Sequence, residues 1–406
     1  MKKILSTNNL SLLTIFCAPL YLIKLSLFGV PFNILELLII ITTLTISWKE
    51  KGTILTKLQK LPKMLFLGML LILFGLFFST LFNNNNYIAS LGIIKGWFIF
   101  PIFFSLALYL QTNSSLTVDR ALKSLYFSII TVSVIAILYK ILAITTYDNR
   151  LTAFYLSPNY LAMYLSPGVF LALYFLRQCF LNKKYNYLFF INIIFLALIV
   201  VVLYWTYSYG AWIAINVSLI VMVPILISSK KILLSYLLLF TLILLLMFSQ
   251  KNNEKFTNLF QHYSSSSLAS RQTISRVSID LILENPITGI GPGNFQERYL
   301  EMQKKYPPYL EWAVPQPHNI FLAFWLQASL FGIIGFLIVL CVVFSECLLL
   351  FKNKKNTALA ATFLAFFIYI LIHGLIDTPY WKNDLAFVFW IFVFSVLSLK
   401  TLEKKY

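Results

Sequence analysis

The residues best suited to chemistry gather in one polar stretch of an otherwise apolar chain. Residues 250–317 hold Arg271, Arg276 and Arg298, which are three of the six arginines, and His318 follows directly. A guanidinium offers a fork of N–H donors that matches phosphate oxygens, and a neutral imidazole accepts a proton near pH 7. This stretch therefore predicts a site that binds an anionic group and transfers a proton.

Arg271 is the strongest candidate for binding the anion. The apolar spacing of residues 271–284 predicts an amphipathic helix. Ser270 would be its N-cap, and Asn285-Pro286 would end it. Free backbone N–H groups in the first turn of a helix, together with a guanidinium, suit a phosphate.

The two other arginines of the stretch also have structural explanations. Arg276 precedes Asp280 by one helical turn and could pair with it. Arg298 could likewise pair with Glu301 or Glu297. Both stay candidates for contact with the same phosphate.

His318 is the candidate proton acceptor. It follows Pro317 and opens a long apolar run, so we expect it at the start of a helix, where the helix dipole favours the neutral imidazole. His373 and Asp377 lie one turn apart at the end of another apolar segment. That pair could orient a substrate, or the two side chains could simply satisfy each other.

Residue spacing does not support a metal or nucleotide site. The cysteines, histidines and carboxylates lack the spacing of metal ligands, so we expect no metal. Gly289, Gly291 and Gly293 superficially suggest a dinucleotide fingerprint, but a predicted helix precedes them. A tight turn between two loop helices, the second from Asn294 to Lys305, is the favoured interpretation. We expect no cofactor.

The elements that must position these residues are membrane helices. Hydrophobic residues make up 60% of the chain and charged residues 11%, which excludes an ordinary soluble domain. One helical span needs about 20 apolar residues. Segments of this kind lie near residues 10–29, 31–48, 64–82, 88–110, 122–144, 157–177, 187–206, 210–228, 232–249, 318–350, 357–376 and 384–400.

The predicted fold class is an all-α polytopic membrane protein with about 12 transmembrane helices and one long extracytoplasmic helical loop. Residues 1–249 would hold transmembrane helices 1–9. Residues 250–317 would form the loop with its amphipathic helices, and residues 318–406 would hold transmembrane helices 10–12.

The formal net charge of +18 predicts orientation in a membrane and not nucleic-acid binding. Lysines and arginines fall in every second connection between apolar segments, for example in residues 49–63 and 352–355, and the intervening connections are nearly neutral. This positive-inside pattern predicts cytoplasmic termini and an outward-facing 250–317 loop. The basic side would contact anionic membrane lipids.

Four ionisable residues fall inside predicted spans, where such groups are costly: Lys24, Glu36, Lys95 and Lys140. All four would lie in the outer part of their spans. They could snorkel to the interface, or Lys24 could pair with Glu36. Alternatively, they could line a positively biased vestibule beside the polar loop, which makes Lys95 a supporting site candidate.

Three sequence elements resemble the O-antigen ligase and O-antigen polymerase superfamily. They are Arg271 with PITGIGPGNF at 286–295, PHNIFL at 317–322 followed by Gly332 and Gly335, and Arg150 with Ser157-Pro-Asn159. The resemblance covers about residues 150–377. It departs at Ser208-Tyr209-Gly210, where the family often has Ser-Arg-Gly.

The resemblance implies an inverting, metal-independent glycosyltransferase in a bacterial inner (plasma) membrane. It would take a glycan from an undecaprenyl-pyrophosphate carrier at the outer face of that membrane and pass it to a lipid or saccharide acceptor. His318 would be the catalytic histidine and Arg271 the loop arginine. Because position 209 lacks an arginine, Arg150, Arg271 and Arg298 would form the pyrophosphate site.

Three functions stay open at this point. A ligase would move a finished glycan onto lipid A-core or a similar acceptor, and the moderate size of the loop favours it. A polymerase would join lipid-linked repeat units. A transporter of lipid-linked sugars would show internal repeats and buried charges across the membrane midplane, which the sequence lacks.

Overall fold

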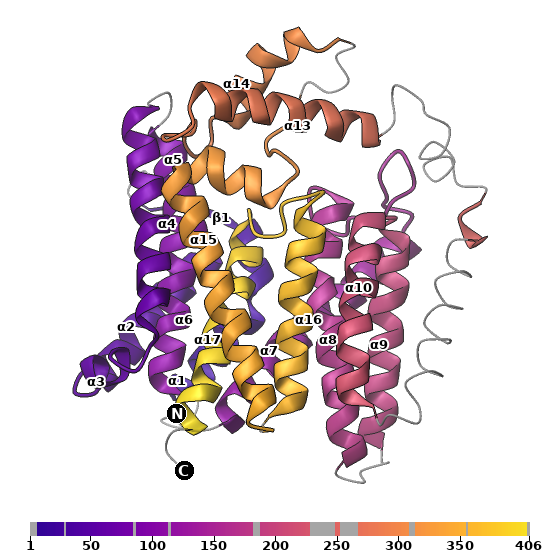
Figure 1. Cartoon of the computed structure of the whole chain (residues 1–406). Coiled ribbons are helices and arrows are strands. Elements are labelled where there is room, and N and C mark those ends of the chain that lie inside the picture. Colours follow the sequence, from indigo (N-terminus) through magenta and orange to yellow (C-terminus); the bar gives the residue numbers. More distant parts are fainter. Residues whose placement is uncertain are drawn as a thin grey trace.

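The computed structural model describes residues 6–27, 30–83, 87–112, 115–181, 187–227, 248–251, 267–307, 313–354 and 356–403. Long helices stand side by side in a bundle, and shorter helices lie across one end of it (Figure 1). In these ranges, eight helices are long and apolar enough to cross a membrane. They are α4 (Lys63–Phe82), the continuous run of α5 (Tyr87–Ile93), η2 (Ile94–Ile99) and α6 (Phe100–Gln111), then α7 (Ser115–Ile141), α8 (Pro158–Leu181), α9 (Tyr187–Trp205), α10 (Tyr209–Leu226), α15 (Ile320–Lys352) and α16 (Thr357–Gly374).

These eight helices correspond to eight of the twelve predicted spans. Two further predicted spans, 31–48 and 384–400, are the helices α2 (Ile34–Glu50) and α17 (Asn383–Glu403). The predicted span 232–249 lies almost entirely outside the described residues. An all-α polytopic membrane protein is thus confirmed, and the number of twelve spans stays a prediction.

The first predicted span, 10–29, is not one helix. Helix α1 (Thr7–Phe16) ends early, and a 3₁₀ turn, η1 (Ala18–Leu22), follows. Strand β1 (Lys24–Leu27) then pairs antiparallel with β2 (Val30–Asn33). Pro19 explains the break, because proline lacks the N–H that a continuing α-helix needs and its ring obstructs the preceding turn.

The polar loop forms the two predicted helices, α13 (Ser267–Glu284) and α14 (Phe295–Met302), the latter extended by η3 (Gln303–Lys305). They share a small core in which Val277, Leu281 and Phe295 are fully buried. The predicted N-cap at Ser270 is wrong, because α13 begins at Ser267. A serine cap contributes only about 1 kcal/mol, which an additional helical turn can replace.

Helix α15 is broken at Ala328 and Ser329, where Ser329 has a φ of 66°. Two helical pieces therefore share the apolar run 318–350, which is longer than one bilayer span needs. Residues 287–291, the glycine turn, follow α13 and supply hydrogen-bond partners to backbone groups at the break. Ile290 N donates to Leu326 O at 2.7 Å, and Leu330 N donates to Ile287 O at 3.0 Å.

Gly289 makes this contact sterically feasible. Its φ is +64°, and a Cβ at this position would lie 2.3 Å from Leu326 O. We expect Gly289→Ala to lower the unfolding free energy by roughly 1–3 kcal/mol, because a strained left-handed residue and a backbone clash are added together. Gly52→Ala is the matched control, since a Cβ at Gly52 meets nothing within 4 Å. Thermal unfolding in detergent measures both, and equal melting temperatures would refute the role of Gly289.

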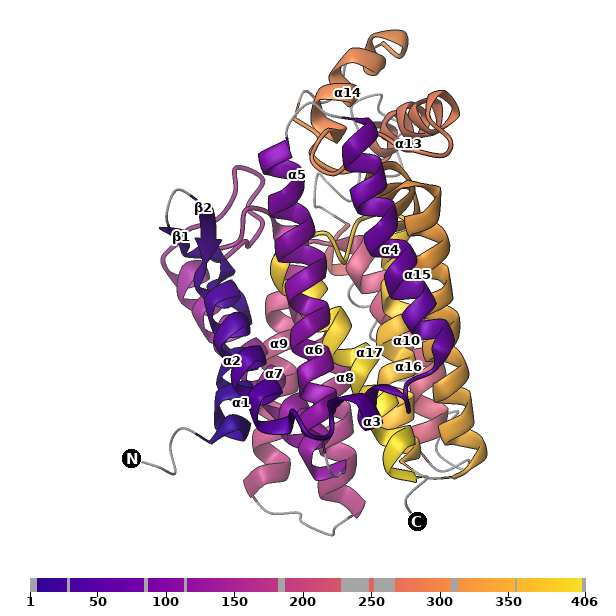
Figure 2. The same cartoon turned by 90° about the vertical axis from the view of Figure 1, so that its left-hand side faces the viewer.

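The loop helices α13 and α14 lie at one end of the bundle, and the first and last described helices reach the opposite end (Figures 1 and 2). Helix α1 begins and α17 ends at the end away from α13 and α14 (Figures 1 and 2). Helix α3 (Ile54–Leu58), in the lysine-rich connection, also lies at the end away from α13. This separation is what the alternating charge pattern requires.

The orientation prediction can be tested with single cysteines after the four native cysteines are replaced. We expect a membrane-impermeant thiol reagent added from outside to label Gln272→Cys on α13, and to label Leu55→Cys on α3 only after the membrane is permeabilised. Both positions are exposed in the structure. A difference in labelling therefore reports the side of the membrane on which each position lies. Labelling of Leu55→Cys alone in intact cells would reverse the topology.

Candidate functional site

Asp377 is the centre of a polar cluster at the same end of the bundle as α13. It lies in the connection between α16 and α17, and its side chain is only 3% exposed. Its Oδ1 lies 3.2 Å from His318 Nδ1. Its Oδ2 accepts a hydrogen bond from Asn159 Nδ2 at 2.9 Å and lies 3.8 Å from Arg271 Nη2. One buried carboxylate thus collects three side chains from three other segments.

The direction of each helix explains why these segments meet. Helix α8 starts at this end just before Asn159, α15 starts here after His318, and α16 finishes here before Asp377. Helix α13 lies across the top and supplies Arg271 (Figure 1). Sequence positions more than 200 residues apart therefore lie side by side.

His318 is held in a strained backbone conformation beside Asp377. Its φ is 47°, in the left-handed region that a histidine seldom adopts. Such strain persists where surrounding contacts fix the residue, often at functional sites. A proton on Nδ1, donated to Asp377, would leave Nε2 as an acceptor, and the side chain is 28% exposed. His318 can therefore reach a ligand while Asp377 orients it.

The expected position of His318 at the start of a helix needs correction. Helix α15 begins at Ile320, and Asn319 is its N-cap, so His318 lies just outside the helix. The Asn319 side chain accepts hydrogen bonds from Phe321 N and Leu322 N. The first-turn N–H groups are thus satisfied by Asn319, and Asp377, not the helix dipole, is the direct partner of the imidazole.

Arg150 is joined to the cluster through Asn159. Its Nη2 donates to Asn159 Oδ1 at 2.7 Å, and its Nε donates to Thr206 O at 2.8 Å. Its Nη1 lies 3.9 Å from Asp148 Oδ2. These contacts fix the guanidinium between the α7–α8 and α9–α10 connections. Burial lowers the pKa of Arg150, and the positive charge of nearby Arg271 lowers it further.

Arg271 has fewer and longer polar contacts than Arg150. Its ion pair with Asp377 is long, at 3.8 Å. Its Nε is buried and has no hydrogen-bond partner among the described residues. A buried donor without an acceptor costs free energy unless a ligand supplies one. Because α13 starts at Ser267, Arg271 lies in the second turn, so the expected help from free first-turn N–H groups is not found.

The other two arginines of the loop lie elsewhere. Arg298 pairs with Glu301 at 3.1 Å, as expected, and approaches Glu284 at 3.8 Å. Arg276 is exposed, about 140° around α13 from Arg271 at 100° per residue. Its expected pair with Asp280 does not form, since Tyr306 OH donates to Asp280 Oδ2 at 2.6 Å instead. The structure brings neither arginine to Asp377.

Of the supporting candidates His373, Asp377 and Lys95, only Asp377 belongs to the cluster. His373 is 1% exposed, and its Nδ1 pairs with Tyr369 OH at 2.7 Å, so it satisfies Tyr369 and not Asp377. Lys95 Nζ lies 2.9 Å from Glu36 Oε2 and donates to Pro31 O. Glu36 thus pairs with Lys95, and the expected Lys24–Glu36 pair is wrong. The β-hairpin that replaces the first span explains this, because it carries Pro31 O to Lys95.

Asn159 is the residue whose importance the residue-by-residue analysis missed. It links Asp377 to Arg150 with both ends of its amide. The Pro-Asn element of the superfamily resemblance was the one signal that pointed to it. Its structural role could not be seen from spacing, since Asp377 lies 218 residues further along the chain.

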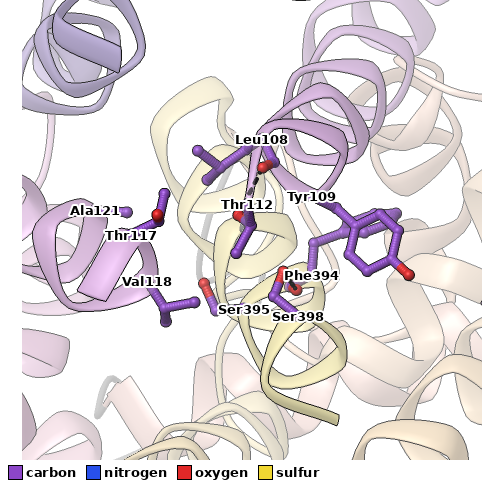
Figure 3. A pocket seen from close by; sticks show the side chains of 9 residues that line it. All are labelled: Leu108, Tyr109, Thr112, Thr117, Val118, Ala121, Phe394, Ser395 and Ser398. Carbon is purple, nitrogen blue, oxygen red and sulfur yellow. Dashed lines mark hydrogen bonds between the residues drawn. The ribbon is translucent and has the colours of Figure 1, made fainter. Parts of the chain in front are cut away.

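A small pocket at the other end of the bundle is not a candidate site for an anion. It lies between α6, α7 and α17, with Leu108, Val118 and Phe394 among its lining residues (Figure 3). The hydroxyl of Thr112, also in the lining, donates to Leu108 O. Its lining has no charged side chain, so it offers nothing for an anion.

Part of the chain matches a known protein family. Residues 194–340 match the family described as O-Antigen ligase. The match confirms the resemblance to the O-antigen ligase and polymerase superfamily. The matched segment contains Arg271, the glycine turn and His318, whereas Arg150, Asn159 and Asp377 lie outside it. No curated protein matches the chain significantly.

The pKa of Asp377 generates a test of the cluster. Burial alone would raise this pKa, but the charge of His318, its hydrogen bond and the charge of Arg271 outweigh burial and hold it well below 3.8. A depressed folded-state pKa contributes stability that is full above the unfolded value and is lost as pH falls further.

We therefore expect the stability difference between the wild type and Asp377→Asn to shrink as the pH falls below about 4. Melting temperatures in detergent at several pH values measure it. A difference that grows as the pH falls below about 4 would contradict the inferred charge on Asp377.

Proposed function

We propose that this chain transfers a glycan from an undecaprenyl-pyrophosphate carrier to an acceptor at the outer face of a bacterial inner membrane. The transfer is of the O-antigen ligase type, with lipid A-core or a similar molecule as the acceptor. The observation that supports it best is the Asp377 cluster. It combines an oriented, accessible imidazole with a guanidinium that has a free buried donor.

The residues of the cluster divide the chemistry between them. Nε2 of His318 takes the proton from the acceptor hydroxyl as its oxygen attacks the anomeric carbon. The bond from that carbon to the pyrophosphate oxygen breaks, and the pyrophosphate leaves with the bonding electrons. Asp377 stabilises the imidazolium that forms, since its carboxylate faces Nδ1.

The arginines act on the leaving group. Arg271 can turn its free Nε–H and its weakly held Nη2 to the growing negative charge on the pyrophosphate. Arg150 is fixed by its other contacts and serves mainly as a rigid positive charge behind Asn159. Attack from the side opposite the leaving group inverts the anomeric centre, and the arginines supply the charge stabilisation in place of a metal.

A polymerase that joins lipid-linked repeat units is the alternative. It would use the same proton acceptor and the same arginines, because both reactions displace a polyprenyl pyrophosphate with a sugar hydroxyl. The two functions differ only in the acceptor. A transfer assay with the purified protein and lipid-linked donor can separate them by offering lipid A-core and a second lipid-linked repeat unit in turn.

The mutational test compares residues inside and outside the cluster. His318→Ala should abolish transfer, and Arg271→Lys should lower the initial rate by about tenfold or more, because lysine keeps the charge but loses the guanidinium fork. Arg276→Lys is the matched control on the same helix and should stay within about twofold.

Expression and melting temperature show whether each variant is folded. Near-normal transfer by folded His318→Ala would remove it from the mechanism. A larger loss for Arg276→Lys than for Arg271→Lys would reverse the assignment of the two arginines.

A further inference from the structure

The connection between α16 and α17 carries a second charged group, Lys382, five residues after Asp377. Two aromatic residues anchor this connection, since Tyr380 and Trp381 are fully buried. Tyr380 OH donates to Trp97 O at 2.9 Å and accepts from Trp390 Nε1 at 2.9 Å. Both ends of a rigid connection, one acidic and one basic, are thus fixed at the same end of the bundle.

Lys382 lies beside the first turn of α8. Its Nζ is 4.5 Å from the ring centroid of Tyr160, the residue next to Asn159. Asn159 in turn donates to Asp377. The ammonium group and Asp377 thus contact neighbouring residues in the first turn of the same helix.

Among the described residues, no carboxylate forms an ion pair with Lys382. Asp384, two residues further along the chain, is fully buried, with Oδ2 accepting from Tyr155 OH at 3.1 Å and Oδ1 accepting from Leu385 N at 2.9 Å. Within the part of the chain that the structure describes, Lys382 and Asp384 form no ion pair. A half-buried ammonium with no ion pair among the described residues can still form a charge-assisted contact with an anion, which makes it a candidate for ligand binding.

A second lysine adds to the positive charge here. Burial lowers the pKa of Lys382, Asp384 opposes that effect, and the charge of Lys24 lowers it further. Lys24 is exposed and begins strand β1. The β-hairpin and α13 stand on opposite sides of the α16–α17 connection (Figure 2). Lys24, on the hairpin, and Arg271, on α13, therefore belong to elements on different sides of this connection.

We propose that Lys382 binds a phosphate-type anion of the acceptor. This assignment to the acceptor rests on the proposed transfer function. If the pyrophosphate of the donor occupies the side of Arg271, the second substrate must reach His318 from another side. An acceptor that carries phosphate would be held there by the ammonium group while its hydroxyl meets the imidazole.

Anion binding can be measured without the transfer reaction. The probe is inorganic phosphate, bound to the purified chain in an Arg271→Ala background so that the arginine side contributes less. We expect Lys382→Gln to weaken phosphate binding by about tenfold, as the loss of one charge-assisted contact predicts. Lys382→Arg should retain most of the affinity.

Lys140→Gln is the matched control. Lys140 lies at the same end of the bundle, is also partly buried, and also faces an aromatic ring, with Nζ 5.8 Å from the Trp205 centroid. It should leave phosphate binding unchanged. Equal phosphate affinities for the Lys382→Gln and Lys140→Gln chains, both with normal melting temperatures, would overturn the proposal.

Kinetics then assign the anion to one substrate. With lipid A-core as the acceptor, Lys382→Gln should raise the KM for the acceptor by about tenfold and leave the KM for the lipid-linked donor within about twofold. A rise confined to the donor KM would overturn the acceptor assignment. If no transfer occurs with the wild type, the proposed function fails, and the phosphate measurement still decides whether Lys382 binds an anion.

Discussion

The buried carboxylate of Asp377 is the constraint on which the rest of the site depends. An ionised carboxylate at 3% exposure is stable only if cations and donors compensate it. Here the compensation comes from His318, Asn159 and Arg271. The burial of one acid therefore requires three other segments to meet at Asp377. The helices of the bundle supply the scaffold, and Asp377 aligns their ends.

The same end of the bundle combines rigid and adjustable parts. The connection that holds Asp377 is anchored by the fully buried Tyr380 and Trp381, and Arg150 is held by Asn159 and Thr206 O. Arg271, in contrast, has a long ion pair and an unpartnered Nε. A substrate would therefore meet a preorganised acid–base pair and one guanidinium that is free to change partners.

Composition and charge pattern predicted the class of fold, most of the spans and the end of the bundle where the polar groups meet. Local rules failed where tertiary contacts prevailed: a hairpin replaces the first span, and Tyr306 takes the carboxylate expected for Arg276. Pattern analysis found His318, Arg271 and Asp377 as separate residues. It could not join them, because Asp377 meets His318 across 59 positions of sequence and meets Arg271 from still further along the chain.

The break in α15 has a consequence for biosynthesis. Leu326 O and Leu330 N find their partners in residues 287–290, which precede α15 in the chain and belong to the polar loop. Within a bilayer, unpaired backbone groups are strongly disfavoured. The upper part of α15 can therefore settle only after the glycine turn has been translocated and folded, so the order of synthesis, loop first and helix second, matches the order in which the two parts must assemble.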